Sequence, residues 1–142
     1  MDFFCLTPNG IRVGYPSPPL LRTLSRSLQD RVRGRAVLAL TANRHYALRG
    51  VRPGARLIAV AHRLGVGRGF HIGLNTWYLG PNGASRLVLK VRNGVIQEIG
   101  IADKRLTDGS RAASRFMEMV KGSLPSCSMV TSPDPPLRTL PT

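Results

Sequence analysis

The sequence predicts an α+β fold in which antiparallel β-meanders pack against helices on one face. Three turn tripeptides lie between β-prone runs, at Pro8-Asn9-Gly10, Pro81-Asn82-Gly83 and Arg92-Asn93-Gly94. Asn-Gly turns close β-hairpins because both residues tolerate left-handed backbone conformations. Three further segments carry apolar residues at helical spacing. A sheet with one apolar face needs such a cover, so the two observations predict the same architecture.

A three-residue loop at each turn gathers apolar side chains on a single face, whereas a two-residue Asn-Gly turn mixes the faces. This register sets Val91 opposite Val95 and Trp77 opposite Leu87. The predicted strands are 2–7, 11–16, 36–43, 74–80, 84–92 and 95–102. The side chains expected beneath the helices are Trp77, Leu79, Leu87, Leu89, Val91, Val95, Ile99 and Ile101. In the first hairpin, the same rule groups Phe3 and Cys5 with Ile11, Val13 and Tyr15.

Helices are predicted over 18–32, 54–64 and 110–121. Ser17 is the candidate N-cap of the first, and Gly65 and Gly122 end the other two. Residues 1–43 supply a hairpin, a helix and a strand, and residues 44–121 supply a helix, a three-stranded meander and the last helix. Both parts are expected to form one domain. Residues 122–142 are rich in Pro and Ser without periodicity, which predicts a disordered tail.

A short internal similarity at an offset of 73 residues suggests a two-copy duplication. Residues 4–10 align with residues 77–83, each ending in Pro-Asn-Gly. The alternative is chance similarity between two hairpins.

The chain is strongly basic. Its 142 residues contain 21 Lys and Arg against 7 Asp and Glu, a net charge of +14. No acidic residue lies between Asp30 and Glu98, where twelve basic residues occur. Such a field attracts an anionic partner or surface. The alternative is that these arginines are ordinary solvated cations of a GC-rich genome. The sequence has no apolar run long enough to span a membrane and no secretory signal at its start.

The sequence shows no pattern typical of an enzyme, a metal site or a cofactor site. His45, His62 and His71 have no ligand spacing, and Asp103 and Asp108 look like helix-entry residues. The glycines of 65–69 lie between a helix and a strand, which is the reverse of a dinucleotide-binding motif. Cys5 and Cys127 form no C-x-x-C pair, and free thiols are favoured over a disulfide between them. We therefore expect no catalytic residue, no metal and no cofactor.

The polar face of the predicted meander is the candidate binding surface. Its outward side chains are expected to be Thr76, Tyr78, Arg86, Val88, Lys90, Arg92, Ile96 and Glu98. An aromatic ring beside cations can stack a base and neutralise phosphates, so the candidate binding residues are Tyr78, Arg86, Lys90 and Arg92. The alternatives are a protein-binding face, a solvated face, or a face covered by the N-terminal hairpin.

Residues 50–102 resemble the SmpA/OmlA-type outer-membrane-assembly lipoprotein domain. The matching positions are Gly50-Val51, Gly54, Val60, Leu64-Gly65, Trp77-Tyr78 and Asn93-Gly94-Val95. The family's proline after Leu-Gly is Val66 here, and no lipidated cysteine follows a signal peptide. The repeat at the 73-residue offset is similar to the duplicated β-lactamase-inhibitor-protein architecture. The sequence pattern as a whole resembles that of secreted proteins of high-GC bacteria. The resemblance implies a binding module outside the cytoplasm if Met1 is an internal start, and a cytoplasmic protein otherwise.

These observations lead to one functional hypothesis and two alternatives. We expect a non-enzymatic, extracytoplasmic protein-interaction or scaffolding module whose partner is an unknown protein or an anionic surface. The first alternative is a basic nucleic-acid-binding protein that uses the outer sheet face. The second is a small enzyme whose site would bring together His45, His71 and a carboxylate.

Overall fold

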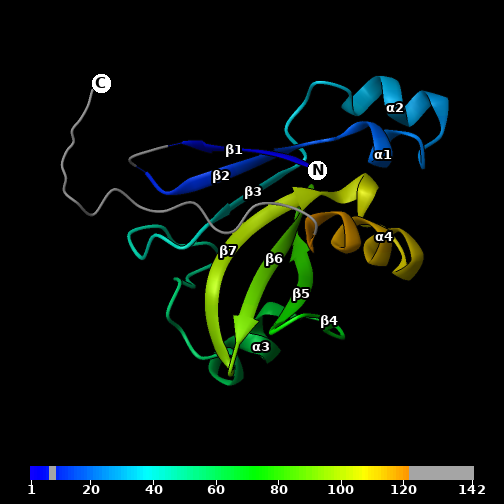
Figure 1. Ribbon diagram of the computed structural model, residues 1–142. Coiled ribbons are helices and arrows are strands. Elements are labelled where there is room, and N and C mark those ends of the chain that lie inside the picture. The colour runs from blue at the N-terminus through cyan, green and yellow to red at the C-terminus, as the bar shows by residue number, and fades with distance from the viewer. Residues whose placement is uncertain (7–8, 122–142) are drawn as a thin grey trace, which may run out of the picture.

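The computed structural model describes residues 1–6 and 9–121, so the expected tail at 122–142 lies outside the described residues. Figure 1 shows the order of the elements along the chain. The strands are β1 (Asp2–Leu6), β2 (Ile11–Tyr15), β3 (Leu38–Thr41), β4 (Phe70–Ile72), β5 (Asn75–Asn82), β6 (Ser85–Arg92) and β7 (Val95–Asp103). The helices are α1 (Pro18–Leu21), α2 (Arg26–Val32), α3 (Leu57–Leu64), the 3-10 turn η1 (Lys104–Leu106) and α4 (Ser110–Lys121).

The seven strands form one antiparallel sheet in the order β1-β2-β3-β7-β6-β5-β4. Two meanders, β1-β2-β3 and β5-β6-β7, meet where β3 pairs with β7. The predicted α+β class with antiparallel meanders is therefore confirmed. The duplication stays a prediction. The 73-residue offset equates Phe4 with Trp77, but these two residues lie on opposite faces of the sheet, which does not support it.

The predicted three-residue loops are wrong. Asn82 pairs with Ser85 and Arg92 pairs with Val95, so two residues close each hairpin. Asn93 and Gly94 both have positive φ, at 52° and 75°, as a type I′ turn requires. Such a turn is favoured because its twist matches that of the flanking strands. In the first hairpin, Leu6 pairs with Ile11.

This shorter register divides the eight apolar side chains that were expected on one face. Trp77 pairs with Lys90, and Leu79 pairs with Val88, so both lie on the face opposite Leu87 and Leu89. Val95 lies with Trp77, whereas the five remaining residues lie together with Ile96, which was expected to point outward. The predicted grouping of side chains in the first hairpin is wrong in the same way. Phe3 and Cys5 share a face with Arg12 and Gly14, not with Ile11, Val13 and Tyr15.

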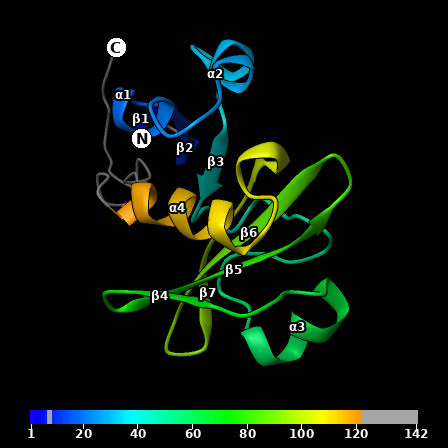
Figure 2. The same cartoon turned by 90° about the vertical axis from the view of Figure 1, so that its right-hand side faces the viewer.

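Both faces of the sheet are partly covered by helices, rather than one face as expected (Figure 2). On one side, here called the α4 face, α1, α2 and α4 pack on β3 and the meander. Its core contains Leu20, Leu21, Val32, Leu38, Leu40, Trp77, Val88, Ala102, Phe116, Met117 and Val120. On the other side, here called the α3 face, α3 and the segment before it cover only β5, β6 and β7. Its core contains Val51, Leu64, Leu87, Leu89, Val91, Ile96 and Ile99.

The predicted helices are present with corrected bounds. The first is broken into α1 and α2, because Thr23 and Ser25 bond to the backbone locally. The Thr23 hydroxyl donates to the Leu20 carbonyl at 2.7 Å, and Ser25 caps α2 by accepting from the Leu28 amide at 3.2 Å. The second predicted helix begins at Leu57, and the strand β4 was not predicted.

Gly100 permits the close approach of β3 to β7. A Cβ atom at this position would clash with the carbonyl oxygen of Ala39 and lie 2.8 Å from Cδ2 of Leu40. We therefore expect Gly100→Ala to lower the free energy of unfolding by about 3 kcal/mol, through overpacking at the junction of the two meanders. Urea denaturation measures this change. Gly67→Ala is the matched control, because nothing lies within 4 Å of its added Cβ; equal losses in both variants would contradict the prediction.

Candidate functional site

The four predicted binding residues do not form one surface. Tyr78 pairs with Leu89 and packs against the core of the α3 face. Arg86, Lys90 and Arg92 alternate along β6 on the α4 face. The expected aromatic platform beside three cations is therefore absent, because the two-residue turn places Tyr78 on the other side of the sheet.

Lys90 belongs to a buried ion cluster on the α4 face. The carboxylate of Glu98 accepts hydrogen bonds from Nε and Nη2 of Arg12, at 3.2 and 3.1 Å, and from Nζ of Lys90 at 3.1 Å. Arg12 and Glu98 are both buried, although Glu98 was expected to point outward. The Arg12 guanidinium also lies 4.8 Å from the Phe3 ring centroid, and Lys90 Nζ lies 5.9 Å from that of Trp77. Two cations share one carboxylate, so the cluster keeps a net positive charge, and its hydrogen bonds join β2, β6 and β7.

Arg92 and Arg86 lie at the two ends of β6. Nε of Arg92 donates to the side-chain oxygen of Asn75 at 3.0 Å. Arg86 is mostly buried and its Nη2 lies 3.5 Å from Oδ1 of Asp108, which is a long contact.

The arginines of the segment before α3 have structural roles. Nη1 of Arg49 donates to the carbonyls of Leu64 and Pro81, at 3.0 and 2.8 Å, at the C-terminal end of α3. Nη1 of Arg52 donates to the carbonyls of Arg44 and His45, both at 3.1 Å. These acceptors are uncharged carbonyls, so they do not neutralise the positive charge of the two guanidinium groups at this end of the molecule.

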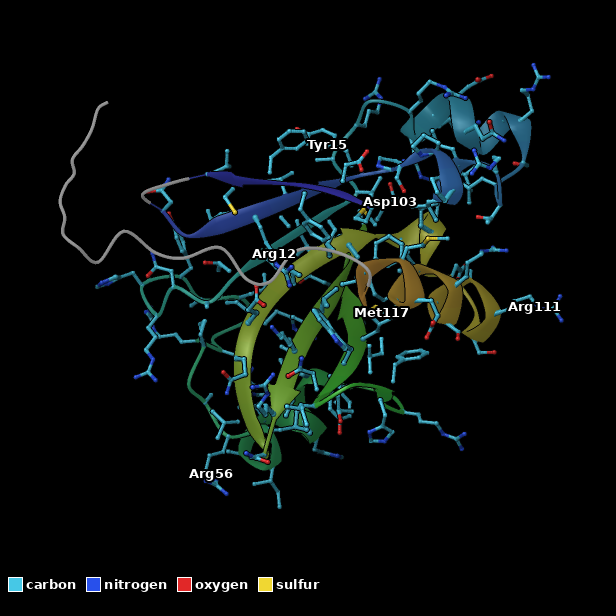
Figure 3. The ribbon with its side chains drawn as sticks, in the orientation of Figure 1. Arg12, Tyr15, Arg56, Asp103, Arg111 and Met117 are labelled. Carbon is cyan, nitrogen blue, oxygen red and sulfur yellow. The ribbon has the colours of Figure 1, made fainter. Side chains whose placement is uncertain are left out.

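The strongest surface feature is an apolar area of the α3 face that α3 does not reach. We call it the open face. The cross-strand row Phe4–Val13–Ala39–Ile101 runs from β1 through β2 and β3 to β7. Phe4 is 59% exposed and Ile101 is 40% exposed. The open face also contains Leu6, Ile11, Tyr15 and Tyr46. Figure 3 shows Tyr15 and Arg12 extending from opposite sides of β2.

A groove runs along the open face over β3 and β7. One hollow of about 160 Å³ is lined by Ile11, Tyr46, Leu48 and Ile99. A larger one of about 570 Å³ reaches the charged residues Asp103, Lys104, Arg105 and Asp108. Ala39 and Ile101 line both hollows, so the two are adjacent. The groove therefore has an apolar floor and a charged end.

Asp103 and Arg105 form an ion pair at that charged end. Arg105 Nη2 lies 2.7 Å from Oδ2 of Asp103, and the Arg105 amide donates to Oδ1 at 2.8 Å. Burial by itself raises the pKa of Asp103. The hydrogen bonds and positive charge of Arg105, with the Leu106 amide, outweigh burial and hold the pKa of Asp103 below its ordinary value of 3.8.

The residues considered for chemistry are dispersed. His45, His62 and His71 lie in a loop, on α3 and on β4, and His71 Nδ1 shares a 3.0 Å hydrogen bond with the Thr76 hydroxyl. Among the described residues, no three His, Cys, Asp or Glu side chains gather where they could hold a metal ion. The described helices are too short or too polar to span a bilayer. Cys5 is disulfide-bonded, so the expectation of a free thiol is wrong there; Cys127 lies outside the described residues.

Sequence reasoning missed the open face because it depends on which strands α3 covers. The alternation of Ile11, Val13 and Tyr15 was a usable signal, since it marks one apolar face of β2. The sequence does not tell a covered apolar face from an uncovered one, so this signal alone does not predict an exposed surface.

Glu98 is expected to be essential for stability. Glu98→Gln leaves the buried Arg12 guanidinium without its counter-charge, which should lower the free energy of unfolding by about 3 kcal/mol. Urea denaturation measures the loss. Asp30→Asn, which removes an exposed carboxylate on α2, is the control and should change stability by less than about 0.5 kcal/mol. A small effect of Glu98→Gln would mean that the cluster is not the buried network described here.

Asp103 should contribute a pH-dependent stability. Because its folded pKa is lowered, its contribution is complete above the unfolded pKa and is lost as the pH falls through the folded value. The difference in free energy of unfolding between the wild type and Asp103→Asn should therefore shrink as the pH falls from about 6 to about 2. Denaturation curves at several pH values test this, and a difference independent of pH would contradict it.

Neither a scan of protein families nor searches of curated proteins and of solved structures returned a match for this chain. The resemblance of residues 50–102 to the outer-membrane-assembly lipoprotein domain therefore stays a prediction. The function of the chain is inferred from its own side chains.

Proposed function

We propose that this protein is a non-enzymatic interaction module whose open face binds a partner protein that has an apolar ridge flanked by acidic residues. The observation that carries the proposal is the row Phe4–Val13–Ala39–Ile101, which no helix of the described residues covers. The same face is covered by α3 over β5, β6 and β7, where it forms a core. An apolar sheet surface left open beside a covered one is typical of a binding site.

The charge of the protein supports an acidic partner. Lys104 and Arg105 line one end of the groove, and Arg52 bonds to the backbone beside Tyr46 at the other end. Asp103 and Asp108 line the same end, so the positive charge that supports an acidic partner is that of the chain as a whole, +14. A second copy of this chain would bring another +14 to the interface. Electrostatic complementarity therefore favours an acidic protein over self-association.

Two further observations support the proposal. The disulfide at Cys5 is typical of oxidising compartments, in agreement with an extracytoplasmic setting. The alternative of nucleic-acid binding on the outer sheet face loses support, since Tyr78 lies on the other face and Lys90 is held in an ion pair with Glu98.

A displayed random-peptide library selected against the purified protein tests the proposal. The selected peptides should combine apolar and acidic residues. Phe4→Ser/Ile101→Ser should weaken their binding about 30-fold, because each residue is expected to contribute about 1 kcal/mol of apolar contact. Calorimetric titration with a selected peptide measures the affinity, and thermal unfolding checks that the variant is folded.

Ile58→Ser/Leu74→Ser is the matched control. These side chains are 87% and 80% exposed and lie outside the open face, on α3 and in the β4–β5 turn. The control should bind the peptides as the wild type does. Equal weakening by both variants would refute the proposed site. A protein that dimerises in light scattering, and becomes monomeric through Phe4→Ser/Ile101→Ser, would assign the open face to a second copy instead.

A further inference from the structure

A second cavity lies on the α4 face and shares Asp108 with the larger hollow of the groove. It has a volume of about 430 Å³ and is formed by the segment 67–70, strands β5 and β6 and the start of α4. Leu79 and Arg86 are among its lining residues, which places it on the α4 face. Its size is within the range of small-molecule sites.

The cavity combines two cations and the carboxylate of Asp108 with an apolar wall. Arg68 comes from the loop after α3 and Arg86 comes from β6, and both line the cavity. Phe70, Leu79 and Ala113 supply the apolar wall. This combination can hold a molecule with an anionic end and an apolar body.

Arg86 is incompletely satisfied in this position. Its Nε atom is buried without a hydrogen-bond partner among the described residues. Its Nη2 contacts Asp108 at 3.5 Å, and the Asp108 side chain is 78% exposed, against 22% for Arg86. A mostly exposed carboxylate at this distance contributes little. Because buried polar groups are ordinarily hydrogen-bonded, the guanidinium is suited to a further acceptor.

Glycine brings the Arg68 segment close to the sheet. A Cβ atom on Gly69 would clash with the Thr76 side chain and lie 2.9 Å from Cε1 of Tyr78. A larger residue at this position would require the loop or the side chains of Thr76 and Tyr78 to move. Gly69, one of the glycines that do not fit a dinucleotide motif, thus has a role in placing Arg68 at the cavity.

We propose that this cavity binds a small organic anion. Its carboxylate or phosphate would contact Arg86 and Arg68, and its apolar body would pack against Phe70 and Leu79. Arginine binds both anions through paired hydrogen bonds. Asp108 then competes with the ligand for Arg86, because both present an anion to the same guanidinium.

Titration calorimetry with phenyl phosphate and with phenylacetate tests the proposal and distinguishes the two head groups. Arg86→Gln should weaken binding of the preferred probe at least tenfold, the loss expected for a charge-assisted hydrogen bond. Asp108→Asn should tighten binding about threefold or more, because it removes the competing carboxylate. This opposite change is not expected of a residue that only supports the fold.

Arg92→Gln is the matched control, since Arg92 lies on the same strand and face and bonds to Asn75 outside the cavity. It should leave the affinity unchanged. Amide shifts of Gly67, Gly69 and Phe70 in NMR spectra should locate the probe. The proposal is overturned if neither probe binds, if Arg92→Gln weakens binding as much as Arg86→Gln, or if inorganic phosphate binds as tightly as phenyl phosphate.

The cavity and the open face can be tested separately. Phe4→Ser/Ile101→Ser should leave anion binding unchanged, and Arg86→Gln should leave peptide binding unchanged. The failure of one proposal is therefore distinguishable from the failure of the other.

Discussion

One extra residue in β7 determines which side chains share each face of the sheet. Val91 pairs with Ile96, but Lys90 pairs with Glu98, so Gln97 is accommodated as a bulge. The two-residue turn at Asn93-Gly94 would otherwise carry one register along the whole hairpin. The bulge shifts that register by one residue and thereby places Ile99 opposite Leu89. The buried core beneath α3 and the inward direction of Glu98 both depend on this shift.

Burial of the Glu98 carboxylate is costly, and a residue of the N-terminal meander offsets this cost. A buried carboxylate is costly unless it is paired and hydrogen-bonded. Arg12 on β2 supplies two of the hydrogen bonds across 86 positions of sequence, and Lys90 supplies a third from the neighbouring strand. The ion cluster therefore links the two meanders on the α4 face, while Gly100 lets their backbones approach at β3 and β7.

The positions of most strands could be predicted from the sequence, because the Asn-Gly turns and the alternation of residues 85–92 are local signals. Their faces could not, since a change of one residue in a turn moves every side chain of a strand to the other side. This error placed Trp77 in the wrong core and Tyr78 in the wrong binding site. The candidate residue Arg86 lines the α4-face cavity. Arg68 and Phe70, which line it as well, come from a loop and a short strand that no local sequence pattern predicts.

The junction between the meanders also suggests an order of folding. Strands β5, β6 and β7 follow one another through tight turns, so their pairing closes short loops. Strand β3 pairs with β7 across roughly sixty residues, as in the pair Leu40 and Gly100. Because closing a long loop costs more chain entropy, we expect the C-terminal meander to form early and the N-terminal one to dock on it late. The last strands to be held in place are then the ones that carry most of the open face.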